Sequence, residues 1–331
     1  MNNFKVTCLL SLCCVLGLDV GATLSDEKAA PNAVQVHLIV TEQPVAEVGD
    51  VPPLRPDDVK VKQGRNSLQV SQLIPARGEN AALHLFVLID DTLTTGVGNN
   101  LNDVRDFINA QPPTTVVGIG YMSNATVDIV QNFTADHSLA AKAVRLPRGR
   151  LSAMDSPYLS LISVVKGWPQ QNVRRTVLMV SDGVDRLRGE TPSRSQLGLS
   201  FGPVFHSMPT ISSDVNSASE ISQRYNVIVN SIYSIGVGRA GRSSWDMQIG
   251  LSGLTKLANE TGGECFSLGT SNPVSFKPYL DRLQKALDHQ YFLVFLAVPG
   301  NNAELQRVNV NTEVPDVELT APDNVWVPAR K

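Results

Sequence analysis

The sequence predicts an α/β fold in which a small β unit precedes a doubly wound, mostly parallel sheet. The first observation is the run from Leu83 to Ile89, which is apolar except for His84. A strand with one face in water alternates between apolar and polar residues, so this run indicates a central strand that helices cover on both faces. The second observation is that strand-like and helix-like segments alternate from Ala81 onward, as in parallel sheets with helical crossovers.

The small β unit is predicted over residues 33–75. Val34–Val40 alternates early, as a half-buried strand does. Val59–Lys62 and Leu68–Val70 are short alternating segments on either side of a turn at Gln63–Asn66. Residues 76–80 then link this unit to a main domain over 81–298.

Capping residues mark the helices of the main domain. Asp136 is a good N-cap, Ser156 followed by Pro157 opens another helix, and a glycine pair at Gly262 closes a third. The predicted helices are Leu101–Ala110, Asp136–Val144, Pro157–Trp168, Asp214–Tyr225, Trp245–Thr261 and Phe276–Leu287. The further predicted strands are Thr115–Met122, Thr126–Phe133, Thr176–Val180, Val227–Ile235 and Tyr291–Val298. A β-rich tail is expected over residues 299–331.

Composition narrows the possible functions. The chain has 331 residues, of which 42% are hydrophobic and 18% charged, as in a globular protein with a large core. The net charge of -3 provides no basic surface for nucleic acid, so nucleic acid is excluded as the expected partner.

The N-terminus has the pattern of a secretory signal peptide over residues 1–22. Lys5 precedes the apolar stretch Val6–Leu18, which is short for a membrane span, and Val20–Ala22 offers small residues for cleavage. An uncleaved anchor is the alternative. After cleavage we expect no integral membrane segment, and an exported protein that is periplasmic or secreted. Of the four cysteines only Cys265 would remain, which excludes an internal disulfide.

Oxygen-bearing side chains follow two of the buried strands. Asp90, Thr92 and Thr94 come at alternate positions after the first strand, and Asp182 follows the apolar run Val177–Val180. Open α/β sheets bind ligands at the carboxyl ends of their strands. Ser156 opens a helix that lies between them in the chain. Hydroxyl and carboxylate oxygens suit Mg²⁺ or a similar hard cation.

These motifs resemble the von Willebrand factor type A (VWA) family, and in particular the exported VWA-related proteins of Acidobacteria. Asp90-x-Thr92-x-Thr94 resembles the Asp-x-Ser-x-Ser of the family's metal-ion-dependent adhesion site, and Asp182 takes the place of its third-loop aspartate. Ser156 takes the place of the second-loop threonine, with Ser152 as the alternative. The helix and turn Leu254–Gly263 are also typical of the family, and the likeness spans residues 34–298.

The resemblance implies a VWA/Rossmann-like sheet and a non-enzymatic protein. It implies that Mg²⁺ or Mn²⁺ is bound by Asp90, Thr92, Thr94, Ser156 and Asp182. The ion would engage an acidic group on a protein or surface ligand. The alternative is a metal-independent interaction scaffold, in which these side chains only cap turns and helices.

Three other features of the sequence match or suggest functional sites. The run Gly236–Gly241 matches a dinucleotide fingerprint but is not followed by the acid that such a site needs. Ser200 matches a hydrolase nucleophile motif, but its flanks are polar and Pro203 follows it. A metal-dependent hydrolase would also lack a visible general base. The long polar segment from Arg186 to Met208 could form a basic and aromatic rim beside the site, or an ordinary solvated insertion.

Overall fold

The computed structural model describes residues 33–44, 53–169, 173–187, 211–237 and 244–330. The predicted signal peptide lies outside these ranges. A six-stranded sheet has the order β10-β9-β8-β5-β6-β7. Its strands are β5 (Leu83–Asp90), β6 (Thr115–Ser123), β7 (Thr126–Thr134), β8 (Arg174–Ser181), β9 (Val227–Tyr233) and β10 (Cys265–Phe266). All neighbouring pairs are parallel except β6 with β7, which confirms the predicted mostly parallel sheet.

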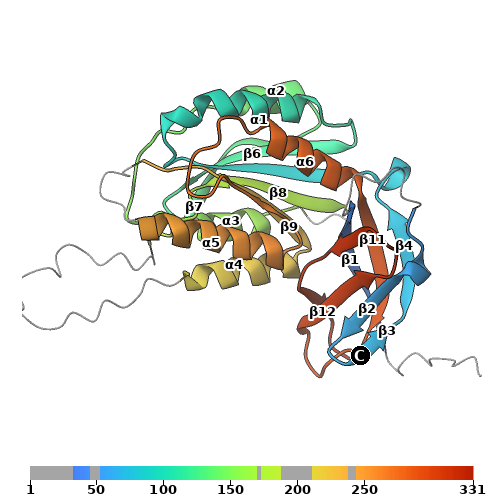
Figure 1. Cartoon of the computed structure of the whole chain (residues 1–331). Coiled ribbons are helices and arrows are strands. Elements are labelled where there is room, and N and C mark those ends of the chain that lie inside the picture. Colours follow the sequence, from blue (N-terminus) through green and yellow to red (C-terminus); the bar gives the residue numbers. More distant parts are fainter. Residues whose placement is uncertain (1–32, 45–52, 170–172, 188–210, 238–243, 331) are drawn as a thin grey trace, which may run out of the picture.

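Helices cover both faces of this sheet (Figure 1). One face carries α1 (Asn100–Asn109), α2 (His137–Ala143) and α6 (Lys277–Asp288). The other carries α3 (Pro157–Lys166), α4 (Ser213–Arg224) and α5 (Ser244–Glu260). Each layer has its own apolar core. Every residue of β5 and β8 is buried, which explains why the central strand is a continuous apolar run.

The remaining strands form two four-stranded sheets, ordered β13-β1-β11-β4 and β14-β12-β2-β3. They share one apolar core. Their bounds are β1 (Val34–Pro44), β2 (Val59–Gln63), β3 (Asn66–Leu68), β4 (Val70–Pro75), β11 (Gln290–Ala297), β12 (Glu304–Thr312), β13 (Val317–Thr320) and β14 (Asn324–Val327). This β unit therefore combines both ends of the described chain.

The position of β11 corrects one expectation. The sequence placed the strand Tyr291–Val298 in the main domain, and a separate tail after it. Instead, β11 pairs antiparallel with β1 and β4, while β12 pairs with β2 and β13 pairs with β1. An apolar strand reveals its burial but not its neighbour, because pairing is decided by tertiary packing.

Local sequence signals account for several connections around the large sheet. The hairpin between β6 and β7 turns through Asn124 and Ala125, both at positive φ, as a two-residue hairpin loop requires. Asp136 and Ser156 cap α2 and α3 by accepting hydrogen bonds from backbone N–H groups, as predicted. Within the described ranges, every helix is too short or too polar to cross a membrane.

Candidate metal centre

The carboxyl ends of β5 and β8 bring two predicted site residues together. These strands are parallel neighbours, with Ile89 opposite Val180. Asp90 and Asp182 therefore emerge side by side, and their relative exposures are only 3% and 1%. Two carboxylates this deep would repel one another unless protons or cations compensate them.

Asp90 is held by two hydrogen bonds. One oxygen, Oδ1, accepts from the Thr92 N–H at 2.9 Å, and Oδ2 accepts from the Ser181 hydroxyl at 2.8 Å. Burial and the negative charge of Asp182 raise the pKa of Asp90 to about 6, although the Arg186 charge opposes this. The ionised form of Asp90 is therefore under-compensated in the folded chain.

Asp182 is held by the loop that follows it. Its Oδ1 accepts from the Val184 N–H at 2.9 Å, and its Oδ2 pairs with Arg186 Nη2 at 2.9 Å. A Cβ at Gly236 would lie 2.2 Å from Asp182 Oδ2, so only glycine lets the backbone pass this close. Burial raises the pKa of Asp182 and the Arg186 charge opposes the rise.

The two threonines of the first loop differ in their surroundings. Thr92 is 2% exposed, and its hydroxyl Oγ1 forms no hydrogen bond of ordinary geometry within the described residues. It interacts weakly with Asp90, whose pKa it helps to lower. A buried hydroxyl that is bonded so weakly is costly, and beside Asp90 its oxygen is available as a metal ligand. Thr94 is only partly buried, and its N–H donates to the Ile235 carbonyl.

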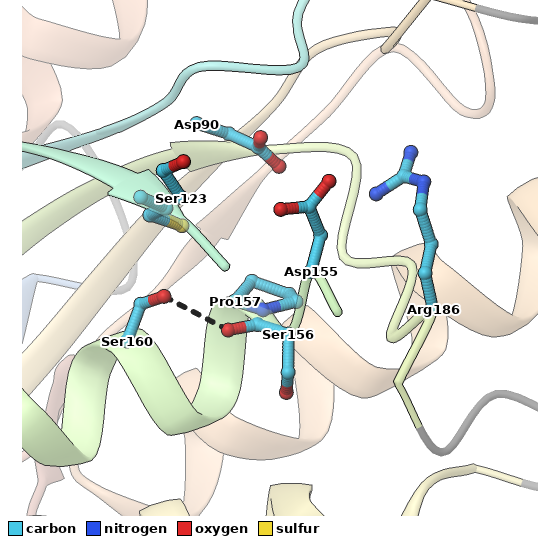
Figure 2. A pocket seen from close by; sticks show the side chains of 8 residues that line it. Asp90, Ser123, Asp155, Ser156, Pro157, Ser160 and Arg186 are labelled. Atoms are coloured by element: carbon cyan, nitrogen blue, oxygen red, sulfur yellow. Dashed lines mark hydrogen bonds between the residues drawn. The ribbon is translucent and has the colours of Figure 1, made fainter. Parts of the chain in front are cut away.

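The second loop presents a residue that sequence reasoning did not choose. Ser156 Oγ accepts from the Leu159 N–H as the helix cap, and Ser152 Oγ accepts from the Met154 N–H. The side chain of Asp155 lies between them in sequence and is 6% exposed. Figure 2 shows the Asp155 carboxylate pointing toward Asp90 and the Arg186 guanidinium. The only feature of the sequence that could have indicated a role for Asp155 is its position directly before Ser156 and Pro157.

A small cavity lies at this junction (Figure 2). Its volume is about 10 Å³, about the room that a single water molecule or ion takes. Of the five predicted ligands, Asp90 and Ser156 line it directly, and Arg186 connects it to Asp182. Its full lining is Asp90, Met122, Ser123, Asp155, Ser156, Pro157, Ser160 and Arg186.

The donor chemistry fits a hard cation. The buried carboxylates Asp90, Asp155 and Asp182 carry more negative charge than Arg186 compensates, and Thr92 adds a weakly bonded hydroxyl. The described residues contain no group of three or more His, Cys, Asp or Glu side chains that could hold a metal. Any ion here would therefore need hydroxyl and water oxygens in addition to one or two carboxylates, and Mg²⁺ accepts such ligands.

The other candidate sites of the sequence, which are the glycine run, Ser200 and the long polar segment, lie mostly outside the described residues. Ser200 and most of the segment from Arg186 to Met208 are outside them, as are residues 238–241 of the glycine run. Arg186 is described, and it faces inward onto Asp182 with 12% of its side chain exposed. It is part of the site rather than of a solvent-facing rim.

No protein-family model and no curated protein matches the chain. Solved structures similar to it include VWA domains. A von Willebrand factor type A protein from Catenulispora acidiphila is 10% identical with a TM-score of 0.42, covering 91% of this chain and 74% of its own. The SpRpn10 VWA domain is 11% identical with a TM-score of 0.36, covering 61% and 95%. An aerotolerance-related membrane protein from Bacteroides fragilis is 9% identical with a TM-score of 0.42, covering 62% and 99%. At these values the likeness assigns no function to the chain.

Proposed function

We propose that this chain is a non-enzymatic, exported binding protein with a VWA-like site for Mg²⁺ or Mn²⁺. The ion would be held around Asp90, Thr92, Thr94, Ser156 and Asp182, with Asp155 close by. Its partner would be a protein or surface ligand that offers an acidic group. Export rests on the N-terminal pattern of residues 1–22.

One observation carries the proposal. Asp90 and Asp182 are buried side by side, with the weakly bonded Thr92 hydroxyl next to Asp90 and a cavity of one-ion size beside it. Burying two ionised carboxylates side by side costs stability unless protons or cations compensate their charge, and such costly arrangements cluster at functional sites. A bound dication would supply that compensation and leave a position for an outside carboxylate.

The chain's own residues would hold and orient this site. The Thr92 N–H and the Ser181 hydroxyl fix both oxygens of Asp90. The Val184 N–H fixes one oxygen of Asp182. Neutral hydroxyls at Thr92 and Ser156 would add donors without adding negative charge. The ion would then keep positive charge for a partner's acid.

A second candidate function follows from Arg186. Its guanidinium already contacts Asp182 at 2.9 Å and supplies one positive charge to the site. If this pair persists in solution, the chain is a metal-independent interaction scaffold. The two candidates differ in whether a divalent cation binds at all.

Calorimetric titration of Mg²⁺ and Mn²⁺ into the purified protein tests the choice. The proposal expects one saturable site in the wild type that is lost in Asp90→Ala and in Asp182→Ala. Asp128→Ala is the matched control, because Asp128 is a half-exposed acid on β7 that does not line the cavity. A folded wild type that binds neither ion, with its fold checked by circular dichroism, would favour the scaffold.

A further inference from the structure

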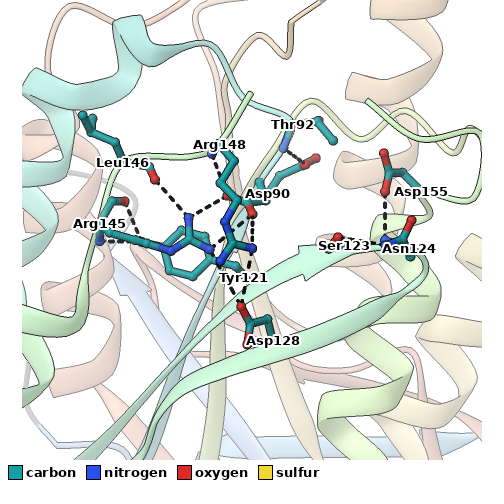
Figure 3. Close-up of polar contacts among 11 residues, drawn as sticks. Asp90, Thr92, Tyr121, Ser123, Asn124, Asp128, Arg145, Leu146, Arg148 and Asp155 are labelled. Carbon is teal, nitrogen blue, oxygen red and sulfur yellow. Dashed lines mark hydrogen bonds and ion pairs between the residues drawn. The ribbon is translucent and has the colours of Figure 1, made fainter. Parts of the chain in front are cut away.

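The segment 145–154, which joins α2 to the second loop, combines a fixed backbone with an unusual surface. It has no helix or strand, yet two buried carboxylates pin it. Asp91 fixes its beginning and Asp155 fixes its end. Figure 3 shows Arg145 and Arg148 at the beginning of the segment, and Asp155 with its hydrogen bond from Asn124 at the end.

The contacts of Asp91 are dense. Arg145 forms two bonds to its carboxylate, at 2.7 and 3.2 Å, and the Arg148 N–H donates to Oδ1 at 2.8 Å. The Gly149 N–H donates to the Asp91 carbonyl at 2.9 Å. The Arg145 guanidinium also lies 3.7 Å from the centre of the Tyr121 ring, whose hydroxyl bonds both the N–H and the carbonyl of Arg145 at 2.6 Å.

The far end is held as firmly. Asp155 Oδ2 accepts from the Ser152 N–H at 2.7 Å, and Oδ1 accepts from the Asn124 N–H at 2.9 Å. Between the ends, Gly149 has a φ of +65°, and a Cβ there would come within 3.3 Å of Val237. The backbone is therefore already ordered, so a ligand would lose little entropy in ordering it.

The outward side chains of this segment are apolar and basic. Three of the nine large hydrophobic side chains exposed on the described residues lie here: Leu146 at 52%, Leu151 at 47% and Met154 at 54%. That concentration in one short segment exceeds scattered surface exposure and is typical of contact surfaces.

Charge selects the kind of partner. Arg148 has 54% of its side chain exposed, and Arg150 is exposed and forms no ion pair with any described residue. The acids that face the segment are Asp91 and Asp155, both buried, and Asp128, which lies 3.7 Å from Arg148 and 4.0 Å from Arg145. The outward charge is therefore positive.

We infer that the exposed face of residues 145–154 docks an extended peptide that combines acidic with large apolar side chains. Leu146, Leu151 and Met154 would receive the apolar groups, and Arg148 and Arg150 the acids. The inference rests on the proposed function in one respect: Asp91 follows Asp90 directly, so the same peptide could place a carboxylate at the ion. The contacts of the segment itself do not use the ion.

The probe is a phage-displayed library of random dodecapeptides, selected on the full chain in Mg²⁺ and, separately, in EDTA. Selected sequences should be enriched in Asp or Glu together with Leu, Ile or Phe. A fluorescent peptide of the selected sequence then reports affinity by anisotropy. We expect about tenfold weaker binding in Arg150→Glu and in a Leu151→Ser, Met154→Ser double variant. Matched controls are Arg65→Glu, in the exposed turn of the β unit, and Leu139→Ser, 47% exposed on α2.

The outcomes separate this inference from the metal site. Binding that persists in EDTA and is lost in the segment variants supports the docking surface and counts against the ion. Binding lost in Asp90→Ala but unchanged in all segment variants supports the ion and overturns the docking surface. A selection without acidic and apolar enrichment also overturns it. Thermal unfolding of each variant shows whether a loss of binding reflects a loss of fold.

Discussion

Asp90 and Asp91 are consecutive residues at the end of β5, and both are buried, but their surroundings are opposite. Asp91 meets two arginines and two backbone N–H groups of the segment 145–154, counting the bond to its carbonyl. Asp90 meets a hydroxyl, one N–H and the charge of a second carboxylate. Asp90 is the last residue of β5 and Asp91 is the first residue after it. One step along the chain therefore moves from the cavity to the contacts of Asp91 with Arg145, Arg148 and Gly149, which we call the clamp.

The pKa values reflect the same contrast. Burial alone would raise the pKa of Asp91, but the hydrogen bonds and charges of Arg145 and Arg148 hold it below its usual value. Burial and Asp182 raise the pKa of Asp90 to about 6. A buried carboxylate that is paired with arginine side chains stabilises a fold, and we call Asp91 the matched carboxylate. A buried carboxylate whose charge is not fully compensated is typical of a functional site, and we call Asp90 the unmatched carboxylate. If this division is correct, substitutions at the two carboxylates change stability in opposite directions.

Removing the matched carboxylate should cost the most. Asp91→Ala leaves the Arg145 guanidinium and the Arg148 N–H without their acceptor, so we expect a loss of about 3 kcal/mol in the free energy of unfolding. Urea unfolding measures it. Limited trypsin digestion should also cut faster after Arg145, Arg148 and Arg150. Asp128→Ala, at a half-exposed acid, should cost less than about 1 kcal/mol. Equal losses in the two variants would contradict the clamp.

Removing the unmatched carboxylate should have the opposite sign. The folded chain disfavours ionised Asp90, because its pKa is raised from 3.8 to about 6. The neutral amide of Asp90→Asn can still accept from the Thr92 N–H, and its NH₂ can donate to Ser181. We expect the variant to be more stable than the wild type by about 3 kcal/mol at pH 7 in EDTA, at 1.36 kcal/mol per pKa unit. Urea unfolding in EDTA measures this, and a destabilised variant would show that Asp90 is structural.

The sequence predicted the position of Asp90 at the end of a buried strand. The apolar run before Asp90 and the alternation of Thr92 and Thr94 placed an oxygen-bearing strand end in a doubly wound sheet, and the structure has that strand end. The caps at Asp136 and Ser156 were also readable, because a cap is a local interaction between a side chain and nearby N–H groups.

What the sequence missed was long-range. Arg145 is 54 residues from Asp91, and no local pattern announces such a pair. Arg186 lies four residues after Asp182, but outside a helix that spacing carries no pairing preference. The position of Asp155 at the site was not predicted, because the sequence left open whether Ser152 or Ser156 takes the second-loop position. Only the path of the loop in the structure shows where Asp155 lies. The neighbours of β11 were likewise set by packing between distant segments.

Substitution of Arg186 tests whether the site around Asp90 and Asp182 binds a cation. A divalent ion near Asp182 would be repelled by the guanidinium that now contacts Oδ2. Arg186→Gln removes this charge, and we expect about tenfold tighter Mg²⁺ or Mn²⁺ binding by calorimetry, which corresponds to about 1.4 kcal/mol. Arg150→Gln is the control, since Arg150 does not line the cavity. Weaker binding in Arg186→Gln would mean that the arginine organises the site instead of competing for it.

The smallest effect is a pH dependence that Asp90 should produce and Asp91 should not. A folded pKa of about 6 against an ordinary value of 3.8 means that Asp90 contributes stability fully below pH 3.8 and loses it as the pH rises through 6. Asp182, also raised, acts in the same direction. Asp91, whose pKa is lowered, stays ionised throughout and contributes nothing to this window. In EDTA, the stability of the wild type relative to Asp90→Asn should therefore fall by about 1 kcal/mol between pH 5 and pH 7. The comparison with the variant cancels histidines and other groups that titrate there. A difference that stays constant across this window would mean that Asp90 is compensated like its neighbour, and the division between clamp and site would be lost.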